Sequence, residues 1–395
     1  ILYGSNNSSA ITWNGTLAAQ SYTGTNTANT AQLGTMTVNN SAAGTVTIKG
    51  GPLDIYSLLT MTKGNLTVGS SPAALTLKST ATQTANVGIV PPACTISGNV
   101  SVERFIQGSN SGPVPDISKR GYRLISSAVY TGTDPTSGAR VFDVQYLTNS
   151  VYVSGPGSGF NVTTTTNPSL YLFREDNIPP PSSSTLFRTE YNWKGIGQIN
   201  NTPVYNIGTQ SKTNKTNVPD TTTTIPVGNG VLFFFRGNKN PGGNSSTSGT
   251  QLIAPFNFPD DVTLTQVGTL NTGTVNVREW YANAAQGNKF SFTAGWVGYG
   301  TSPLTGGYTF VGNPYASTIN WEKYNRNGAN STIYGTVATT IWMFNPANKQ
   351  FQAYTQKSSV TSVADTTTTI NSGTGSASNM IASGQGFFVQ ATATG

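Results

Sequence analysis

The first hundred residues carry short segments in which apolar and polar residues alternate, each bounded by Gly, Asn or Ser. This alternation is typical of strands with one buried face. The clearest segments are 35–38, 45–48, 58–61, 66–68 and 75–77. The first two recur as the next two after 23 residues (35 to 58) and 21 residues (45 to 66), close to one coil of a β-solenoid. We therefore expect a short parallel β-solenoid over residues 1–100, with an antiparallel sandwich as the alternative.

Beyond residue 100 the apolar segments become longer and more aromatic, and loops rich in Pro, Ser, Thr and Asn separate them. No segment shows a convincing helical period, and one helical turn is expected at 317–324. The expected strands are 100–106, 122–129, 141–147, 170–174, 231–236, 262–267, 274–281, 289–297, 308–312, 340–344, 350–356 and 386–391. Many strands joined by polar loops predict an all-β protein of sandwich or jelly-roll architecture.

The region beyond residue 100 also resembles itself. Four segments recur in the same order: 121–125 matches 307–311, 170–173 matches 341–344, 220–225 is identical to 365–370, and 228–230 matches 384–386. Four ordered matches favour a duplicated sandwich over a chance similarity of Thr-rich runs. The predicted domains are therefore a solenoid at 1–100, a sandwich at 101–250 and a second, similar sandwich at 251–395.

Only 9% of the residues are charged, although about 25% is usual in globular proteins. Polarity comes instead from Thr, Asn, Ser and 44 Gly residues, which suit strands and tight turns better than helices. The net charge of +7 is spread along the chain, and the nearest basic cluster, Lys212 with Lys215, is expected in a solvated loop. These features argue against a nucleic-acid partner, and no stretch approaches the roughly 18 apolar residues of a transmembrane helix.

The chain has no histidine and a single cysteine, Cys94. It therefore lacks the usual group for proton transfer at neutral pH, the commonest transition-metal ligand and the nucleophile–histidine pairs of many hydrolases. We expect Cys94 to be a small buried apolar residue. We also expect the protein to be non-catalytic and to need no cofactor.

Paired carboxylates are the best remaining chemistry for an enzyme. The candidates are Glu103, Asp143, Glu175, Asp176, Glu190, Asp260, Asp261, Glu279 and Glu322. Glu175 with Asp176, and Asp260 with Asp261, fall at strand ends, where carboxylates commonly cap turns or hold a structural Ca²⁺. Because no EF-hand spacing is present, the sequence names no catalytic residue and no set of metal ligands.

Aromatic side chains are the other chemical resource, because sugar rings stack on Trp and Tyr. Trp193, with Tyr191 beside it, lies among polar residues and is the predicted glycan-stacking site. The other tryptophans are expected mostly in the core. Phe290, Phe292 and Trp296, for example, alternate along one face of a predicted strand.

Two glycine-containing motifs have a structural interpretation. The segment 312–315 (GNPY) predicts a turn, because Asn-Pro starts turns and Gly permits an unusual φ, with Tyr315 and Trp321 closing the corner as apolar plugs. The runs 228–230 and 384–386 lack the further Gly, Lys or helix that phosphate-binding loops require. They are expected as bends before buried strands.

Several of these segments together resemble a known family. Residues 100–105 (VSVERF), 120–127 (RGYRLISS), 311–317 (VGNPYAS, followed by Trp321) and 384–389 (GQGFFV) are similar to motifs of secreted, cell-surface β-rich proteins of Bacteroidetes, exported through the type IX secretion pathway. Ala316 stands where the family usually has a second proline. The family's C-terminal sorting domain is missing after Gly395, so a cleaved signal or an interior segment of a longer chain is expected.

The resemblance implies an extracellular or cell-surface location. It also implies O-glycosylation at Thr221 and Thr366, because some proteins of these bacteria carry glycans at Asp-Thr followed by Thr or an apolar residue. The preferred function is a structural or adhesive surface protein, a subunit or repeat of a surface fibre or large adhesin. The alternative is a carbohydrate-binding module of a secreted glycan-degrading system.

The terminal segments suggest how such a protein would associate. Residues 1–19 and 371–395 contain no charged side chain, although natural edge strands are usually guarded by charges or Pro. We therefore expect self-association, or association with other surface proteins, by addition of strands. Pairing of these segments within their own domain is the alternative.

Overall fold

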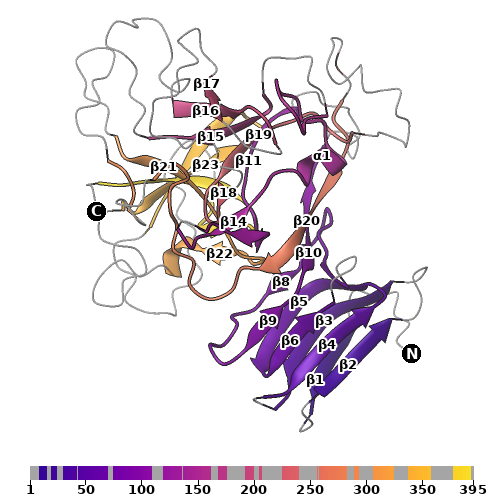
Figure 1. Ribbon diagram of the computed structural model, residues 1–395. Helices are drawn as coiled ribbons and strands as arrows, with labels where there is room; N and C mark the ends of the chain where they lie inside the picture. The colour runs from indigo at the N-terminus through magenta and orange to yellow at the C-terminus, as the bar shows by residue number, and fades with distance from the viewer. Residues whose placement is uncertain are drawn as a thin grey trace, which may run out of the picture.

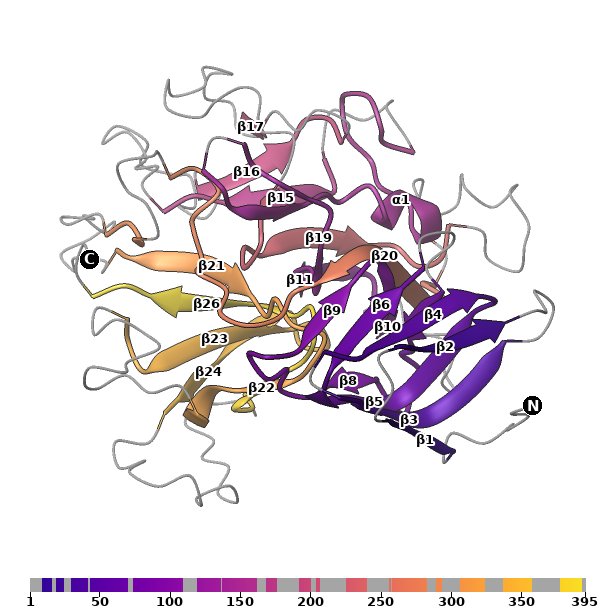
Figure 2. The same ribbon diagram turned by 60° about the horizontal axis from the view of Figure 1, so that its bottom comes forward.

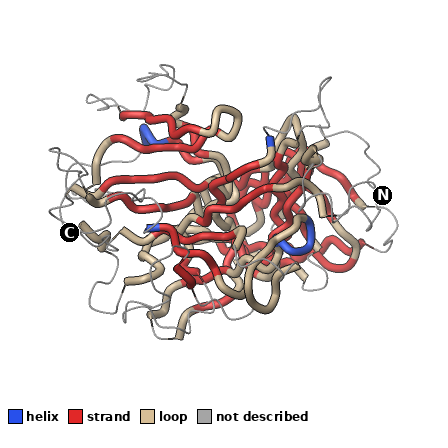
Figure 3. The backbone as a smooth tube through the Cα atoms, turned by 90° about the horizontal axis from the view of Figure 1, so that it is seen from above, coloured by secondary structure: helices blue, strands red, loops and turns tan. Residues whose placement is uncertain are grey.

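The computed structural model confirms an all-β fold with a parallel solenoid (Figure 1). In the described part of the chain, helical structure is limited to α1 (Leu147–Ser150), the single helical residue Asn192 and short 3-10 turns such as η4 (Trp321–Lys323), and Figure 3 shows strands throughout. The described residues are 9–15, 19–24, 30–41, 43–69, 74–108, 119–135, 137–161, 168–175, 192–199, 204–206, 225–239, 256, 258–282, 289–292, 306–323, 337–356 and 377–392.

The N-terminal solenoid is built from two parallel sheets that the chain visits in turn. One sheet has the order β1-β3-β5-β7 and the other β2-β4-β6-β9. The strands are β1 (Ala10–Asn14), β2 (Ala19–Gly24), β3 (Ala31–Asn39), β4 (Thr45–Gly50), β5 (Leu53–Lys63), β6 (Asn65–Val68), β7 (Leu75–Leu77), β8 (Asn86–Val87) and β9 (Thr95–Ser97). This arrangement confirms the solenoid and excludes the antiparallel sandwich for this region.

Apolar alternation sets the register of the coils. Thr35 lies opposite Leu58, as the 23-residue spacing predicts. In the second sheet Val46 lies opposite Leu66, so that repeat is 20 residues and the expected 21 was one too many. A slip of one residue would turn the fully buried Val46 and Ile48 toward solvent. Cys94 is buried beside this core, as predicted.

The solenoid ends in strands that come from beyond its predicted boundary. β10 (Val100–Ile106) pairs in parallel with β7 and antiparallel with β20 (Val262–Leu270), which in turn pairs with β12 (Val129–Tyr130). Residues 262–270 were expected in the second sandwich. They join the first sheet instead, because their alternating buried side chains complete two cores, Val262 and Leu264 in the first sandwich and Leu270 in the solenoid.

The two largest of the remaining sheets have the same strand order. In the first repeat (121–235) the order is β11-β19-β15-β16-β17, and in the second repeat (308–390) it is β21-β26-β23-β24. The strands are β11 (Gly121–Ile125), β15 (Leu170–Phe173), β16 (Trp193–Ile196), β17 (Val204–Asn206), β19 (Val231–Phe235), β21 (Tyr308–Gly312), β23 (Thr340–Asn345), β24 (Gln350–Thr355) and β26 (Gly386–Gln390). Figure 2 shows the two sheets as neighbouring layers beside the solenoid.

The registers of the two sheets agree as well. Ile125 lies opposite Val231 in the first sheet, and its predicted counterpart Val311 lies opposite Phe387 in the second. Tyr171 lies opposite Leu232, and Trp342 lies opposite Phe388. The predicted matches of 121–125 with 307–311 and of 170–173 with 341–344 are therefore confirmed.

The match between the two Thr-rich runs, 220–225 and 365–370, lies outside the described residues except for Ile225. Ile225 belongs to β18 (Ile225–Pro226), which with β13 (Gly132–Thr133) and β14 (Arg140–Phe142) forms a small sheet. In the second repeat, β22 (Ile319–Asn320) and β25 (Met380–Ile381) form a comparable short antiparallel pair.

Four predicted strands also differ from the structure. Residues 122–129 divide between β11 and the start of β12, which belong to different sheets. Residues 274–281 and the described residues 289–292 form no strand, and 141–147 divides into the end of β14 and the start of α1. Polar contacts hold residues 279–281 and Ser291 in irregular backbone, including a 2.7 Å hydrogen bond between the Tyr281 and Ser291 hydroxyls. The helical turn expected at 317–324 is present as η4.

The two repeats exchange backbone pairs reciprocally. Ile125 forms an isolated bridge with Gln385 of the second repeat, and its counterpart Val311 forms one with Asn229 of the first. The N–H of Ser126 donates to the Gly384 carbonyl at 2.8 Å, and the N–H of Gly312 donates to the Gly228 carbonyl at 2.8 Å. These contacts are related by an approximate two-fold axis between the repeats.

The glycine runs supply the bends that this exchange requires. Gly228 has a φ of +92° and Gly384 a φ of +62°, values that favour glycine. Each bend is followed at once by a buried central strand, β19 or β26, as the sequence predicted.

The Asn-Pro turn ties the second repeat to the solenoid. The fully buried Asn313 side chain donates to the carbonyls of Ser317 (2.7 Å) and Ile381 (3.0 Å). The Ala316 carbonyl accepts the N–H of Val87 at 2.8 Å, and the Ala316 side chain lies in the solenoid core. The predicted structural role of this motif is confirmed, although it joins two units and does not merely close one corner.

We predict that Gly312→Ala destabilises the protein by about 1–3 kcal/mol, the usual cost of overpacking. A Cβ at this position would lie 2.1 Å from the Ser126 Cβ across the two-fold contact. Chemical denaturation of both proteins measures the change. Gly132→Ala is the matched control in a strand, since its Cβ would meet nothing closer than 3.8 Å, and a shift below about 0.5 kcal/mol is expected. Equal stabilities of the two variants would contradict the prediction.

Candidate functional site

Trp193 lies in the contact between the two repeats. Its ring packs edge to face against Phe173 of its own repeat, and against Phe310 (5.5 Å between centroids) and Phe388 (5.9 Å) of the second repeat. Trp193 is partly buried, and these three edge-to-face contacts give it a packing role between the repeats. Glycan stacking at Trp193 stays a prediction. Tyr191, its predicted companion, lies outside the described residues.

The two faces of this contact carry the same kinds of side chain. Tyr122 meets Tyr171 edge to face at 6.2 Å, and the counterparts Tyr308 and Trp342 meet edge to face at 5.1 Å. The apolar cluster between the sheets comprises Leu124, Phe173, Trp193, Leu232, Tyr308, Phe310, Trp342, Phe344 and Phe388. The aromatic side chains of this cluster therefore join the two repeats.

Most of the candidate carboxylates make local or structural contacts. Glu103 accepts from the Lys78 ammonium at 2.5 Å, and Asp54 lies 3.9 Å from the same ammonium. Asp143 accepts the N–H of Gln145 at 2.9 Å, and Asp261 accepts the N–H of Gly108 at 2.7 Å. Among these contacts only that of Asp143 is a local turn cap, whereas Asp261 joins segments 153 residues apart and does not show the expected capping role. Asp176 and Glu190 lie outside the described residues.

Glu175 and Glu279 are the two candidates that the structure brings together. Both are buried, and each binds the start of the second repeat: a Glu175 carboxylate oxygen accepts the N–H of Gly307 at 2.8 Å, and Glu279 accepts the Thr309 hydroxyl at 3.0 Å. Glu279 also accepts the N–H of Ser291 at 3.2 Å. With 1% exposure, its carboxylate is closed to a substrate from solvent. The sequence did not indicate this pairing, because the residues lie on distant segments.

Burial raises the pKa of Glu279 to about 7, and the nearby Glu175 carboxylate adds to the rise, while the hydrogen bonds from Ser291, Tyr281 and Thr309 oppose it. Deprotonation near neutral pH therefore leaves a charge in a buried contact between the repeats. This pair is suited to holding the second repeat in place, with a strength that depends on pH.

The open end of the solenoid has inward apolar side chains that the described fold covers only in part. The inward side chains of its first coil, Ile11, Trp13 and Tyr22, are only partly buried, whereas Met36 and Ile48 in the next coil are fully buried. β1 and β2 are the edge strands of their sheets. We name this face the coil end; it consists of β1 and β2.

The backbone of the coil end is unguarded. β1 pairs only with β3, and β2 pairs only with β4, among the described strands. Neither strand contains a charged residue or Pro, the usual guards of an exposed edge. The coil end can therefore accept a further strand by main-chain hydrogen bonding.

The predicted glycosylation sites and the lysine pair lie outside the described residues. Thr221, Thr366, Lys212 and Lys215 are not among the described residues. Within the described ranges, no three His, Cys, Asp or Glu residues gather as a metal site would need. No helix among those ranges is long and apolar enough to cross a membrane.

We predict that Glu279 makes the protein less stable as the pH rises. Its folded-state pKa lies above the unfolded value of 4.5, so its stabilising contribution is complete below about pH 4.5 and is lost as the pH passes about 7. Glu279→Gln should remove up to about 3 kcal/mol of the stability difference between pH 4.5 and pH 8. Denaturant unfolding at both pH values tests this, with Asp143→Asn as the control that keeps the wild-type difference. An unchanged pH dependence in Glu279→Gln would contradict the assignment.

Comparison with protein-family models, with curated proteins and with solved structures gives no match to this chain.

Proposed function

We propose that this chain is a non-catalytic structural module of an extracellular or cell-surface assembly, and that it associates with a second copy through the coil end. The observation that carries the proposal is the contrast between the half-exposed first coil and the fully buried second coil. The motif resemblance to secreted surface proteins supports the location. The export route follows from that resemblance alone.

A second copy is the occupant that the topology favours. The far end of the longer sheet is already paired antiparallel with β20, and that sheet continues to β12. Head-to-tail stacking of solenoids is therefore obstructed. The coil ends of two copies can meet across a two-fold axis, as in an isologous dimer. In that arrangement β1 of one copy pairs antiparallel with β1 of the other, and β2 pairs in the same way with β2.

The apolar side chains of the coil end would gain burial in such a dimer. Trp13 and Tyr22 are large aromatic residues of the kind that dominate interface energetics. Asn14 and Asn39 already share a side-chain hydrogen bond of 3.2 Å across the first two coils, and such a ladder can continue onto an added strand.

We predict that the wild-type protein dimerises with rising concentration and that Thr12→Lys with Ser21→Lys weakens the dimer by at least about tenfold. Both residues are exposed positions on the edge strands, where lysine opposes strand addition. Light scattering after gel filtration over a concentration series measures the mass.

The matched control is Thr47→Lys with Thr67→Lys. These residues occupy the same row of the second sheet, since Ser21 lies opposite Thr47 and Thr47 opposite Thr67, but they belong to interior strands. The control should dimerise as the wild type does. A wild type that stays monomeric at the highest concentration, or a control that loses the dimer equally, would overturn the proposal.

A further inference from the structure

A cleft of about 330 Å³ opens where the solenoid sheet meets both repeats. Its volume is within the range of small-molecule sites. The residues that line it come from the end of β10 and the segment after it, from the approach to β11 and β11 itself, and from β23 with the turn that follows. The coil end lies at the opposite, first coil of the solenoid (Figure 1).

Three cationic residues line this cleft: Arg104, Lys119 and Arg123. No carboxylate belongs to its described lining, and the ion pairs of the described residues involve Lys78 with Asp54 and Glu103. In a chain with so few charges, the described lining of this one cleft therefore carries three positive charges and no negative charge.

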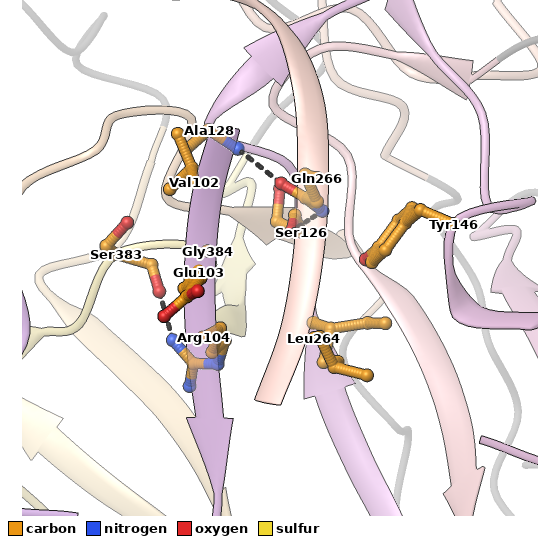
Figure 4. A pocket seen from close by; sticks show the side chains of 11 residues that line it. Val102, Glu103, Arg104, Ser126, Ala128, Tyr146, Leu264, Gln266, Ser383 and Gly384 are labelled. Atoms are coloured by element: carbon orange, nitrogen blue, oxygen red, sulfur yellow. Dashed lines mark hydrogen bonds between the residues drawn. The ribbon is translucent and has the colours of Figure 1, made fainter. Parts of the chain in front are cut away.

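The two guanidinium groups are held by backbone carbonyls. Arg104 donates to the Ser383 carbonyl, as Figure 4 shows from the side of a small neighbouring pocket. Arg123 donates to the carbonyls of Tyr122 (2.9 Å) and Lys119 (2.6 Å) and lies over the Phe235 ring. Neutral carbonyls orient a guanidinium and leave its positive charge uncompensated.

Burial lowers the pKa of both Arg104 and Arg123 to about 10. Both therefore remain protonated at neutral pH, in surroundings that disfavour their charge. An anion in the cleft would compensate this cost. Two arginines also offer the forked geometry that carboxylates and phosphates accept.

The rest of the lining has polar and apolar parts. Side-chain amides come from Gln107, Asn345 and Gln385, while Leu124 and Pro346 are among the apolar residues. An inorganic anion would use only the cations. A sugar acid would use the cations for its carboxylate, the amides for its hydroxyl groups and the apolar residues for the face of its ring.

We propose that this cleft binds a uronate-type sugar acid, with its carboxylate at Arg104, Lys119 and Arg123. The ligand is a free monosaccharide or the terminal unit of an acidic polysaccharide; both present the same chemistry. The site is independent of the coil end, so it can be present whether or not the chain dimerises.

Titration calorimetry with glucuronate and galacturonate tests the proposal, with glucose, galactose and inorganic sulfate as comparison ligands. We expect both uronates to bind, the neutral sugars not to bind, and added salt to weaken the binding. Arg123→Gln and Lys119→Glu should each weaken uronate binding at least tenfold. An oligosaccharide with one terminal uronate separates the two sources, since it binds only if the cleft admits a chain end.

Arg140→Gln is the matched control. Arg140 also donates to a backbone carbonyl, that of Thr272 at 3.2 Å, and also lies over an aromatic ring, that of Tyr130, but it is outside the cleft. This control, and the coil-end variant Thr12→Lys with Ser21→Lys, should bind uronates as the wild type does.

Three results would overturn the proposal: no uronate binding, equal binding of neutral and acidic sugars, or wild-type affinity in both Arg123→Gln and Lys119→Glu. Sulfate binding as tight as uronate binding would overturn the sugar-acid assignment. Thermal unfolding of each variant separates a lost site from a lost fold, and Lys119→Glu alters a partly exposed residue that carries no core packing.

Discussion

The reciprocal backbone pairing between the two repeats is the contact on which the rest of this fold depends. Ser126 donates to Gly384 and Gly312 donates to Gly228, so each repeat supplies the same donor and the same acceptor to the other. This exchange places the aromatic faces of the two sheets together and positions the Asn-Pro turn against the solenoid. Neither repeat can shift without breaking both hydrogen bonds and opening the aromatic contact.

The solenoid is asymmetric as a consequence. Its late coils are covered, because β20 pairs with β10 and Ala316 of the Asn-Pro turn enters the core. Its first coil, β1 and β2, has partners on one side only among the described strands. The same hydrophobic driving force that joins the repeats therefore favours a further partner at the coil end.

Because so few residues of this chain are charged, the position of each charged side chain indicates its role. Lys78 is paired with Asp54 and Glu103 on the solenoid, and Glu175 and Glu279 bind the start of the second repeat. Arg104, Lys119 and Arg123 lie instead along one cleft, where backbone carbonyls hold the guanidinium groups. Assembly at the coil end and anion binding in this cleft are thus separate proposals. The first rests on the burial of apolar side chains, and the second rests on uncompensated positive charge.

The sequence by itself determined the all-β class and the equivalence of β11 with β21 and of β15 with β23, because apolar periodicity is a local property that fixes which face of a strand is buried. It favoured the parallel solenoid, but only the pairing of the folded strands excluded the antiparallel sandwich. It could not assign β20 to the solenoid sheet, since that strand's alternation fits either neighbour and only its antiparallel pairing with β10 decides between them. Trp193 showed the same limit, because its polar neighbours in sequence do not reveal the aromatic rings that the second repeat brings to it. Nor could it bring Arg104 and Arg123 to one cleft or Glu175 to Glu279: those residues lie on separate segments, and their distances are fixed only when the long-range contacts of the folded chain form.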